Sequence, residues 1–314
     1  MSTRPVTIAL ALALVLLAAC SSTRKLGPDE YFDEATTAFE KEEYEIAIKS
    51  YKEMLDQYPF SEHAEEAELR IAHAHYKNRQ YPEAVAAFND FQRMHPMSAH
   101  LPEVYYLLGM SYMDQMRTID RDQSASENAH GWFRVVLDRY PESSYADKAR
   151  HEIAVCREAL AEHELYITTY YLKRDNVKAG ENRVKSIVEI YPDTRAATRA
   201  LDRLAAAYEK AGEARQAELA RAAVAERIAA GIGVPADDDE DEVPPATTTP
   251  VAHGPATHAL LADLSARYGS GDSAPPSTAT AAAPALVDPE GERRPGTTGD
   301  PRYGPGPGFE PGAY

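Results

Sequence analysis

Apolar side chains between residues 81 and 96 recur at steps of three and four, which is the spacing of one helical stripe. Ala84, Phe88 and Phe91 occupy this stripe behind Tyr81. The small Ala84 lets a neighbouring helix approach, and the two rings fill the space beyond it. Because Pro96 cannot continue a helix, the pattern predicts a helix that ends just before it.

The same template occurs in four places along the chain. Each copy has a small residue near its start, two large apolar residues on the stripe, a proline at its end, and Ser or Thr two residues later. We expect that hydroxyl to accept the first free amides of the next helix. The four prolines lie 37, 45 and 51 residues apart, a spacing that fits helix pairs of about 34 residues with insertions. They are Pro59, Pro96, Pro141 and Pro192.

No stretch of alternating polarity predicts a strand, so residues 31–230 are expected to be all-α. They resemble tetratricopeptide repeats, with five helix pairs stacked into a superhelix whose concave wall suits a peptide. The polar surface of the last helix is interpreted as a terminal face toward water. The expected helices include 44–58, 62–77, 81–95, 102–116 and 145–172, and a last pair that begins at Thr194 and is divided at Gly212.

The N-terminus has the layout of a signal peptide. Arg4 precedes an apolar run that is too short to span a bilayer. The run ends in Leu-Ala-Ala-Cys, which is similar to the lipobox of bacterial lipoproteins. We therefore expect residues 1–19 to be a signal peptide, Cys20 to be acylated, and residues 20–30 to form a disordered, lipid-anchored tether. Ser21, in place of the Asp that retains lipoproteins at the inner membrane, indicates the outer membrane; the alternative is an ordinary signal peptide with an incidental cysteine.

The last part of the chain, residues 231–314, has the composition of a disordered tail. Six consecutive acids, Asp237 to Glu242, precede a region dominated by Pro, Gly, Ala, Ser and Thr. Such a segment cannot bury enough apolar area to offset the entropy of ordering. Leu260, Leu261, Leu264 and Tyr268 have helical spacing, which we interpret as a transient helix of no consequence, although a stable amphipathic helix is the alternative.

The charge balance and the motifs argue against nucleic-acid binding and against catalysis. The formal net charge is −17, whereas nucleic-acid binding needs a basic face. The chain lacks a phosphate-binding glycine loop and the common hydrolase and metalloprotease motifs, so no enzyme activity, cofactor or metal is expected. Two histidines, His73 and His75, are two residues apart on a helix and point in different directions. Cys156 lies on an apolar stripe and is interpreted as a buried thiol.

Several short motifs follow one another between Cys20 and about Ala230, namely Tyr58-Pro59-Phe60, Tyr76-Lys77-Asn78, Asp120-Arg121-Asp122-Gln123, Arg139 to Ser143, Tyr170-Tyr171, Asn182-Arg183-Val184 and Tyr191 to Thr194. With their order and spacing, this part of the chain resembles the BamD family of the β-barrel assembly machinery. The acidic tail departs from that family's core. The resemblance implies a non-enzymatic outer membrane scaffold that binds the barrel protein BamA through its C-terminal repeats. It also implies contact with other lipoproteins of the machinery, and reception of the C-terminal strand of unfolded β-barrel proteins by the N-terminal repeats.

Four residues of the second and third repeats are the candidates for a substrate-peptide groove, namely His73, Tyr76, Tyr105 and Tyr112. A tyrosine offers a rigid ring to an aromatic side chain and a hydroxyl to a peptide backbone. The alternative is that these aromatic residues pack one repeat against the next. Truncation to Ala separates the two roles, because a packing residue loses stability and a groove residue loses affinity.

The candidates for the BamA interface lie in the fourth and fifth repeats, and an arginine there can pair with a partner carboxylate through two hydrogen bonds. The alternative for each is an ordinary solvated side chain. Two rival functions stay open: a periplasmic tetratricopeptide lipoprotein that organises cell-wall or polysaccharide machinery, and an enzyme with an unrecognised site. The interface candidates are Asn182, Arg183, Asp193, Arg195 and Arg199.

Overall fold

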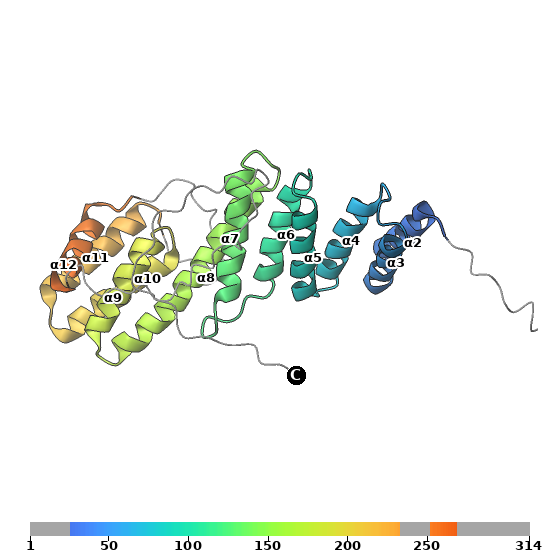
Figure 1. Ribbon diagram of the computed structural model, residues 1–314. Coiled ribbons are helices and arrows are strands. Elements are labelled where there is room, and N and C mark those ends of the chain that lie inside the picture. Colours follow the sequence, from blue (N-terminus) through green and yellow to red (C-terminus); the bar gives the residue numbers. More distant parts are fainter. Residues whose placement is uncertain (1–25, 233–251, 269–314) are drawn as a thin grey trace, which may run out of the picture.

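The computed structural model describes residues 26–232 and 252–268, in which all regular secondary structure is α-helical (Figure 1). Ten consecutive helices pack as five pairs, so the predicted all-α, tetratricopeptide-like array of five repeats is confirmed. The pairs are α2 (Pro28–Glu40) with α3 (Tyr44–Gln57), α4 (Ala64–Lys77) with α5 (Tyr81–Met94), α6 (Leu101–Met113) with α7 (Ser124–Arg139), α8 (Ala146–Lys173) with α9 (Val177–Ile190), and α10 (Arg195–Ala211) with α11 (Ala214–Ala229).

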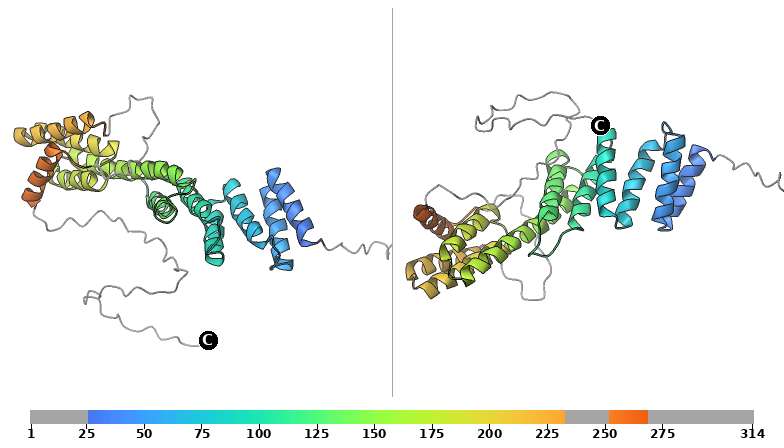
Figure 2. Two further views of the ribbon diagram at one scale, coloured as in Figure 1. Left: turned by 90° about the horizontal axis from the view of Figure 1, so that it is seen from above. Right: turned by 60° about the horizontal axis from the view of Figure 1, so that its bottom comes forward.

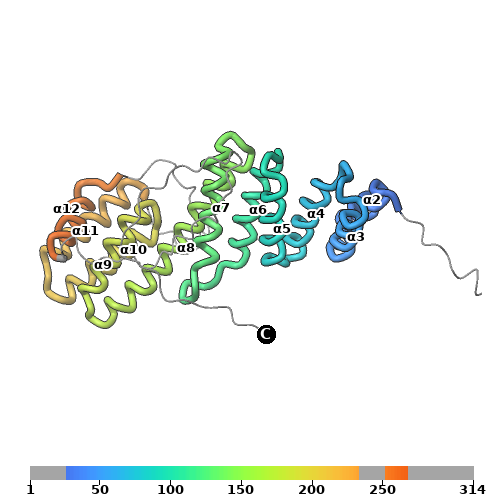
Figure 3. Tube along the Cα trace, viewed as in Figure 1, coloured from blue at the N-terminus to red at the C-terminus, as the bar shows by residue number. Residues whose placement is uncertain are grey.

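The pairs stack in chain order into an elongated array, with the first and last repeats at opposite ends (Figures 1 and 2). The tube view shows that the turns α3–α4, α5–α6 and α7–α8 lie along one edge (Figure 3). The first helices of neighbouring repeats, α4, α6 and α8, therefore run in the same direction. Within the described ranges no helix is both long and apolar enough to cross a bilayer.

The repeat prolines end the second helix of each of the first four pairs, as predicted. The residues before them, Tyr58, His95, Tyr140 and Tyr191, leave helical geometry with φ values of −133°, −122°, −133° and −120°. This is expected because a following proline disfavours the α conformation.

The predicted hydroxyl cap is correct at Thr194, whose Oγ1 accepts the Ala197 amide at 3.2 Å. It is wrong at Ser61, Ser98 and Ser143. The hydroxyls of Ser61 and Ser98 accept the amides of His63 and His100, the residues before α4 and α6, at 3.0 and 3.1 Å. Oγ of Ser143 makes no hydrogen bond within the part of the chain that the structure describes.

Three clusters of buried side chains form the core. The longest helix, α8, joins two of them, because Ile153 and Cys156 lie in the central cluster and Leu160 and Leu172 lie in the C-terminal one. Gly180 on α9 faces Leu172 so closely that an added Cβ would lie 2.2 Å from its side chain. This contact explains why the fourth repeat has Gly where the others have Ala.

The prediction of one disordered tail is wrong over residues 255–268. Helix α12 (Pro255–Tyr268) packs against α11 and α9 at the C-terminal end of the array (Figure 2). Leu260 and Leu264 are 0% and 1% exposed and belong to the C-terminal cluster. The interpretation of this helix as transient is therefore corrected, because its leucines complete a hydrophobic core.

Polar contacts fix both ends of α12. The carboxylate of Glu226 on α11 accepts the backbone amides of Ala256 and Thr257 at 2.7 and 3.2 Å, which satisfies free donors of the helix N-terminus. Near the other end, Arg267 donates to Glu181 at 2.9 Å and to Glu213 at 3.2 Å. The prediction that the last repeat helix faces water is wrong on its α12 side, where alanines of α11 are buried.

Several sequence expectations fall on residues outside the described ranges. They concern the signal peptide, Cys20 and most of the tether, and also the acidic run from Asp237 to Glu242.

Candidate protein-binding surfaces

The first helices of the second to fourth repeats present one continuous row of polar and aromatic side chains, which we call the α4–α6–α8 face. His73 and Tyr76 come from α4, Glu103 and Tyr106 from α6, and Tyr145 immediately precedes α8. Nε2 of His73 lies 3.6 Å from Oε1 of Glu103, and the rings of Tyr106 and Tyr145 are 5.3 Å apart. Contacts across all three helices thus build this face.

Burial shifts the pKa values of the ionisable groups of this face. It raises the pKa of the Tyr106 hydroxyl to about 12, with Glu152 and Tyr145 adding to the effect. Burial, helped by Asp114, also raises the pKa of Tyr76. Burial lowers the pKa of His73, although the nearby Glu103 carboxylate opposes it. At neutral pH the face therefore offers phenolic hydroxyls and an uncharged imidazole, and among the described residues Nε2 of His73 makes no hydrogen bond.

Of the four groove candidates, the structure brings His73 and Tyr76 together on this face. Tyr112 is half-buried against the central cluster, and burial raises its pKa. Tyr105 is only 3% exposed and stacks on Trp132 at 5.8 Å, so its assignment to a groove is wrong. The sequence pattern indicated Tyr105 instead of Tyr106, which lies one helical turn after Glu103 on the same side of α6. Successive helix residues point about 100° apart, so these two adjacent tyrosines face different directions.

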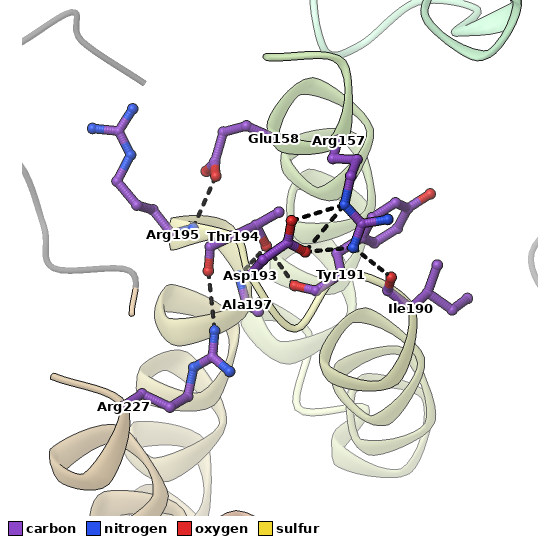
Figure 4. A network of polar contacts seen from close by, with 9 residues as sticks. All are labelled: Arg157, Glu158, Ile190, Tyr191, Asp193, Thr194, Arg195, Ala197 and Arg227. Carbon is purple, nitrogen blue, oxygen red and sulfur yellow. Dashed lines mark hydrogen bonds and ion pairs between the residues drawn. The ribbon is translucent and has the colours of Figure 1, made fainter. Parts of the chain in front are cut away.

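The C-terminal candidate Asp193 is engaged inside the protein (Figure 4). The guanidinium of Arg157 on α8 binds the Asp193 carboxylate, with Nε donating to Oδ2 at 2.9 Å. It also donates to the carbonyl of Ile190 at 2.9 Å. The same guanidinium lies 5.4 Å from the centre of the Tyr191 ring. Asp193 therefore anchors the α9–α10 turn to α8.

The N-terminus of α10 is capped from both sides. Glu158 on α8 accepts the amides of Arg195 and Ala196 at 2.8 and 2.9 Å. Arg227 on α11, which is 3% exposed, donates to the Thr194 carbonyl at 3.1 Å (Figure 4) and to Thr198 Oγ1 at 2.8 Å. Burial lowers the pKa of Arg227 to about 10. These contacts make the α8–α10–α11 junction a connected polar network.

The other interface candidates differ in whether their side chains already have partners within the protein. Arg183 donates to Glu164 at 2.7 Å, and its guanidinium lies 5.6 Å from the centre of the Tyr171 ring. Arg199 pairs with Glu158 and Glu162 of α8. Asn182 is partly buried on α9. The side chain of Arg195 instead points away from the network that its backbone joins (Figure 4).

Two features of the described ranges bear on nucleophilic chemistry and metal binding. Cys156 is fully buried, as predicted, and burial raises the pKa of its thiol to about 12, so the reactive thiolate is not formed near neutral pH. One group in these ranges has spacing suited to a metal, namely Asp29, Glu62 and His63. Its two acids are exposed, and His63 already bonds Asp29 at 3.1 Å.

Comparisons with known proteins identify the family of this chain. The family model YfiO, described as an outer membrane lipoprotein, matches residues 24–223. The chain is 32% identical to the outer membrane protein assembly factor BamD of Vibrio cholerae, over 64% of this chain and 89% of that protein. It is also 32% identical to BamD of Xylella fastidiosa, over 66% and 76% of the two chains, and 29% identical to BamD of Neisseria meningitidis, over 61% and 75%. The chain therefore belongs to the BamD family of outer membrane lipoproteins.

Proposed function

We propose that this chain is a non-enzymatic scaffold for assembling β-barrel proteins into the outer membrane. It would be anchored through acylated Cys20, dock on BamA through its last repeats, and receive the C-terminal strand of unfolded barrels on the α4–α6–α8 face. The relatives named as outer membrane assembly factors support the general role. The observation that carries the finer proposal is the row of aromatic and polar groups that spans three repeats.

The chemistry of that face suits an extended peptide that ends in an aromatic residue. Tyr106 and Tyr145 give rigid rings on which an aromatic side chain can pack at low entropic cost. The carboxylate of Glu103 and the imidazole of His73 provide acceptors for the amides of a strand with unpaired edges. Micromolar affinity, about −8 kcal/mol, is enough for a receptor that passes its substrate on.

Two adjacent tyrosines allow a controlled test of the peptide face. A labelled peptide with the C-terminal strand of a barrel protein is titrated into wild type, Tyr106→Ala and Tyr105→Ala. We expect Tyr106→Ala to weaken binding several-fold, and to lose less stability than Tyr105→Ala although its ring also contacts Phe133. We expect Tyr105→Ala to lower stability by about 3–5 kcal/mol, because it leaves a cavity beside Trp132, and to bind normally while folded. Wild-type affinity in Tyr106→Ala would exclude this face as the receptor.

For docking on BamA, Arg195 is the leading candidate, because its guanidinium points away from the internal network (Figure 4). Arg183, Arg199 and Asp193 already form ion pairs within the protein. Replacing any of them would change the stability of the fold as well as binding to BamA. Arg195→Glu should weaken copurification with BamA without loss of helical signal. Arg215→Glu makes the same charge change at an exposed site of the terminal repeat and should not. Equal copurification of both variants would place the interface elsewhere.

Anchoring by acyl chains is tested separately at Cys20. Burial of many methylene groups holds a doubly or triply acylated protein on a bilayer without a spanning helix. Replacing Cys20 with Ala should release the protein from outer membrane fractions of cells that lack BamA. Retention of the variant there would mean that another feature holds the chain on the membrane.

A further inference from the structure

The turns between repeats place equivalent residues along one edge of the array (Figure 3). The residue that follows each repeat proline is Phe60, Met97, Glu142 and Asp193 in turn. Phe60 is 100% exposed and Met97 is 83% exposed, and Met94, at the end of α5, is 50% exposed. This edge is therefore apolar in the first two repeats, whereas the third has the exposed Glu142 and the carboxylate of Asp193 in the fourth is bound by Arg157.

Hydrogen bonds within the first two turns hold these apolar side chains outward. Oγ of Ser61 accepts the His63 amide at 3.0 Å, and Oγ of Ser98 accepts the His100 amide at 3.1 Å. The Ser98 hydroxyl also donates to Glu65 of α4 at 2.6 Å. Because the turns are built alike and tied to their neighbours, the exposure of Phe60 and Met97 is a property of the fold. Large apolar groups clustered on one rim mark a surface for a partner or a membrane.

The same edge is where the N-terminal tether joins the array. The hydroxyl of Tyr58 donates to the carbonyl of Leu26 at 2.9 Å, and this contact fixes the end of the tether beside the turn that holds Phe60. Leu26 is the sixth residue after Cys20, which corresponds to a contour length of roughly 20 Å at most. An acylated Cys20 would therefore keep this turn within that distance of the bilayer surface.

We propose that Phe60, Met97 and Met94 contact the lipid interface of the membrane that holds the acyl chains, so that this edge is a second membrane contact. The inference rests on the acylation of Cys20 in the proposed function. The hydroxyl-bearing ring of Tyr58, 6.5 Å from that of Tyr31, suits the boundary between lipid and water.

Charge does not drive the contact, because the acids Asp29 and Glu62 near the first turn would repel anionic headgroups. Binding of this edge is therefore apolar, and added salt does not weaken it, because salt screens this repulsion. Glu142, at the same position in the third repeat, is an exposed acid, so the apolar part of the edge ends with the second repeat. The array then approaches the bilayer through its N-terminal end.

The test uses the full, acylated chain on vesicles of phosphatidylethanolamine and phosphatidylglycerol. The variants Phe60→Cys and Met97→Cys are each labelled with an environment-sensitive fluorophore. Glu142→Cys is the matched control, since it occupies the equivalent position of the third turn. The native Cys156 is 0% exposed and stays unlabelled, and acylation consumes the thiol of Cys20.

We expect a blue shift at positions 60 and 97, and quenching of both fluorophores by nitroxide-labelled lipid, with neither change at position 142. Acylated protein that binds the vesicles but gives the same emission at all three positions would overturn the second contact and leave the anchor intact. A shift at position 60 that requires added BamA would identify a protein interface and also overturn it. Failure of the acylated protein to bind the vesicles would refute the anchor in the proposed function, and this inference with it.

Discussion

Helix α12 is expected to stabilise the C-terminal core although it lies beyond the matched family region. A chain that stops after residue 251 loses α12, whereas a chain that stops after residue 268 keeps it. The first truncation exposes the alanine-rich side of α11 and leaves Glu226 without the amides that it caps. It should therefore unfold at lower urea concentration, and the second truncation should match the full chain.

The size of the effect follows from the buried leucines. Leu264 is 1% exposed, and truncating a fully buried leucine to alanine costs about 2–5 kcal/mol. We expect α12 to detach while the repeats stay folded, in which case the loss cannot exceed the free energy with which α12 docks. The double variant Leu260→Ala, Leu264→Ala should therefore resemble the truncation after residue 251 rather than double the single loss.

Urea unfolding and amide hydrogen exchange measure this prediction directly. The amides of α11 at Ala217, Ala220 and Ala223 should exchange faster once α12 is removed. Identical midpoints and exchange rates for the two truncations would show that α12 does not support the repeats.

Two further predictions concern the polar network at the α8–α10–α11 junction and the buried His130. Asp193→Asn should destabilise the α8–α10 junction by about 2 kcal/mol, measured by urea unfolding, because it removes the charge that Arg157 grips; an unchanged midpoint would contradict this. Burial and the charges of Arg157 and Arg134 lower the pKa of His130 to about 4, so its contribution to stability is complete above pH 6.5 and is lost as the pH falls toward 4. The loss is at most about 3 kcal/mol, and a His130→Gln variant should show a flatter fall in melting temperature over that range.

The sequence predicts the repeated part of this fold well because each repeat contains its own signals. The aromatic stripe, the small residue and the terminal proline are all local, and together they place the helices within a few residues. Helix α12 is harder to predict from the sequence because its leucines are buried only through contact with the repeats, including α11. The composition around them is typical of a disordered chain. Its burial depends on a contact partner some thirty residues away, such as Glu226.

The binding surfaces were only partly predictable for the same reason. Tyr105 and Tyr106 are adjacent, yet one is in the core and the other is on the α4–α6–α8 face, so an error of one residue reverses the interpretation. The pair Arg157 and Asp193 joins residues 36 positions apart, and no local pattern indicates it. Sequence motifs marked the region around Asp193 but not its internal role.

Photocrosslinking in intact cells tests the proposed scaffold most directly. A photoreactive amino acid is placed at Arg195 in one variant and at Tyr106 in another, and the captured proteins are identified by mass spectrometry. The account predicts BamA at position 195 and precursors of outer membrane barrels at position 106. Capture of cell-wall or polysaccharide enzymes at both positions, without BamA or barrel precursors, would contradict it.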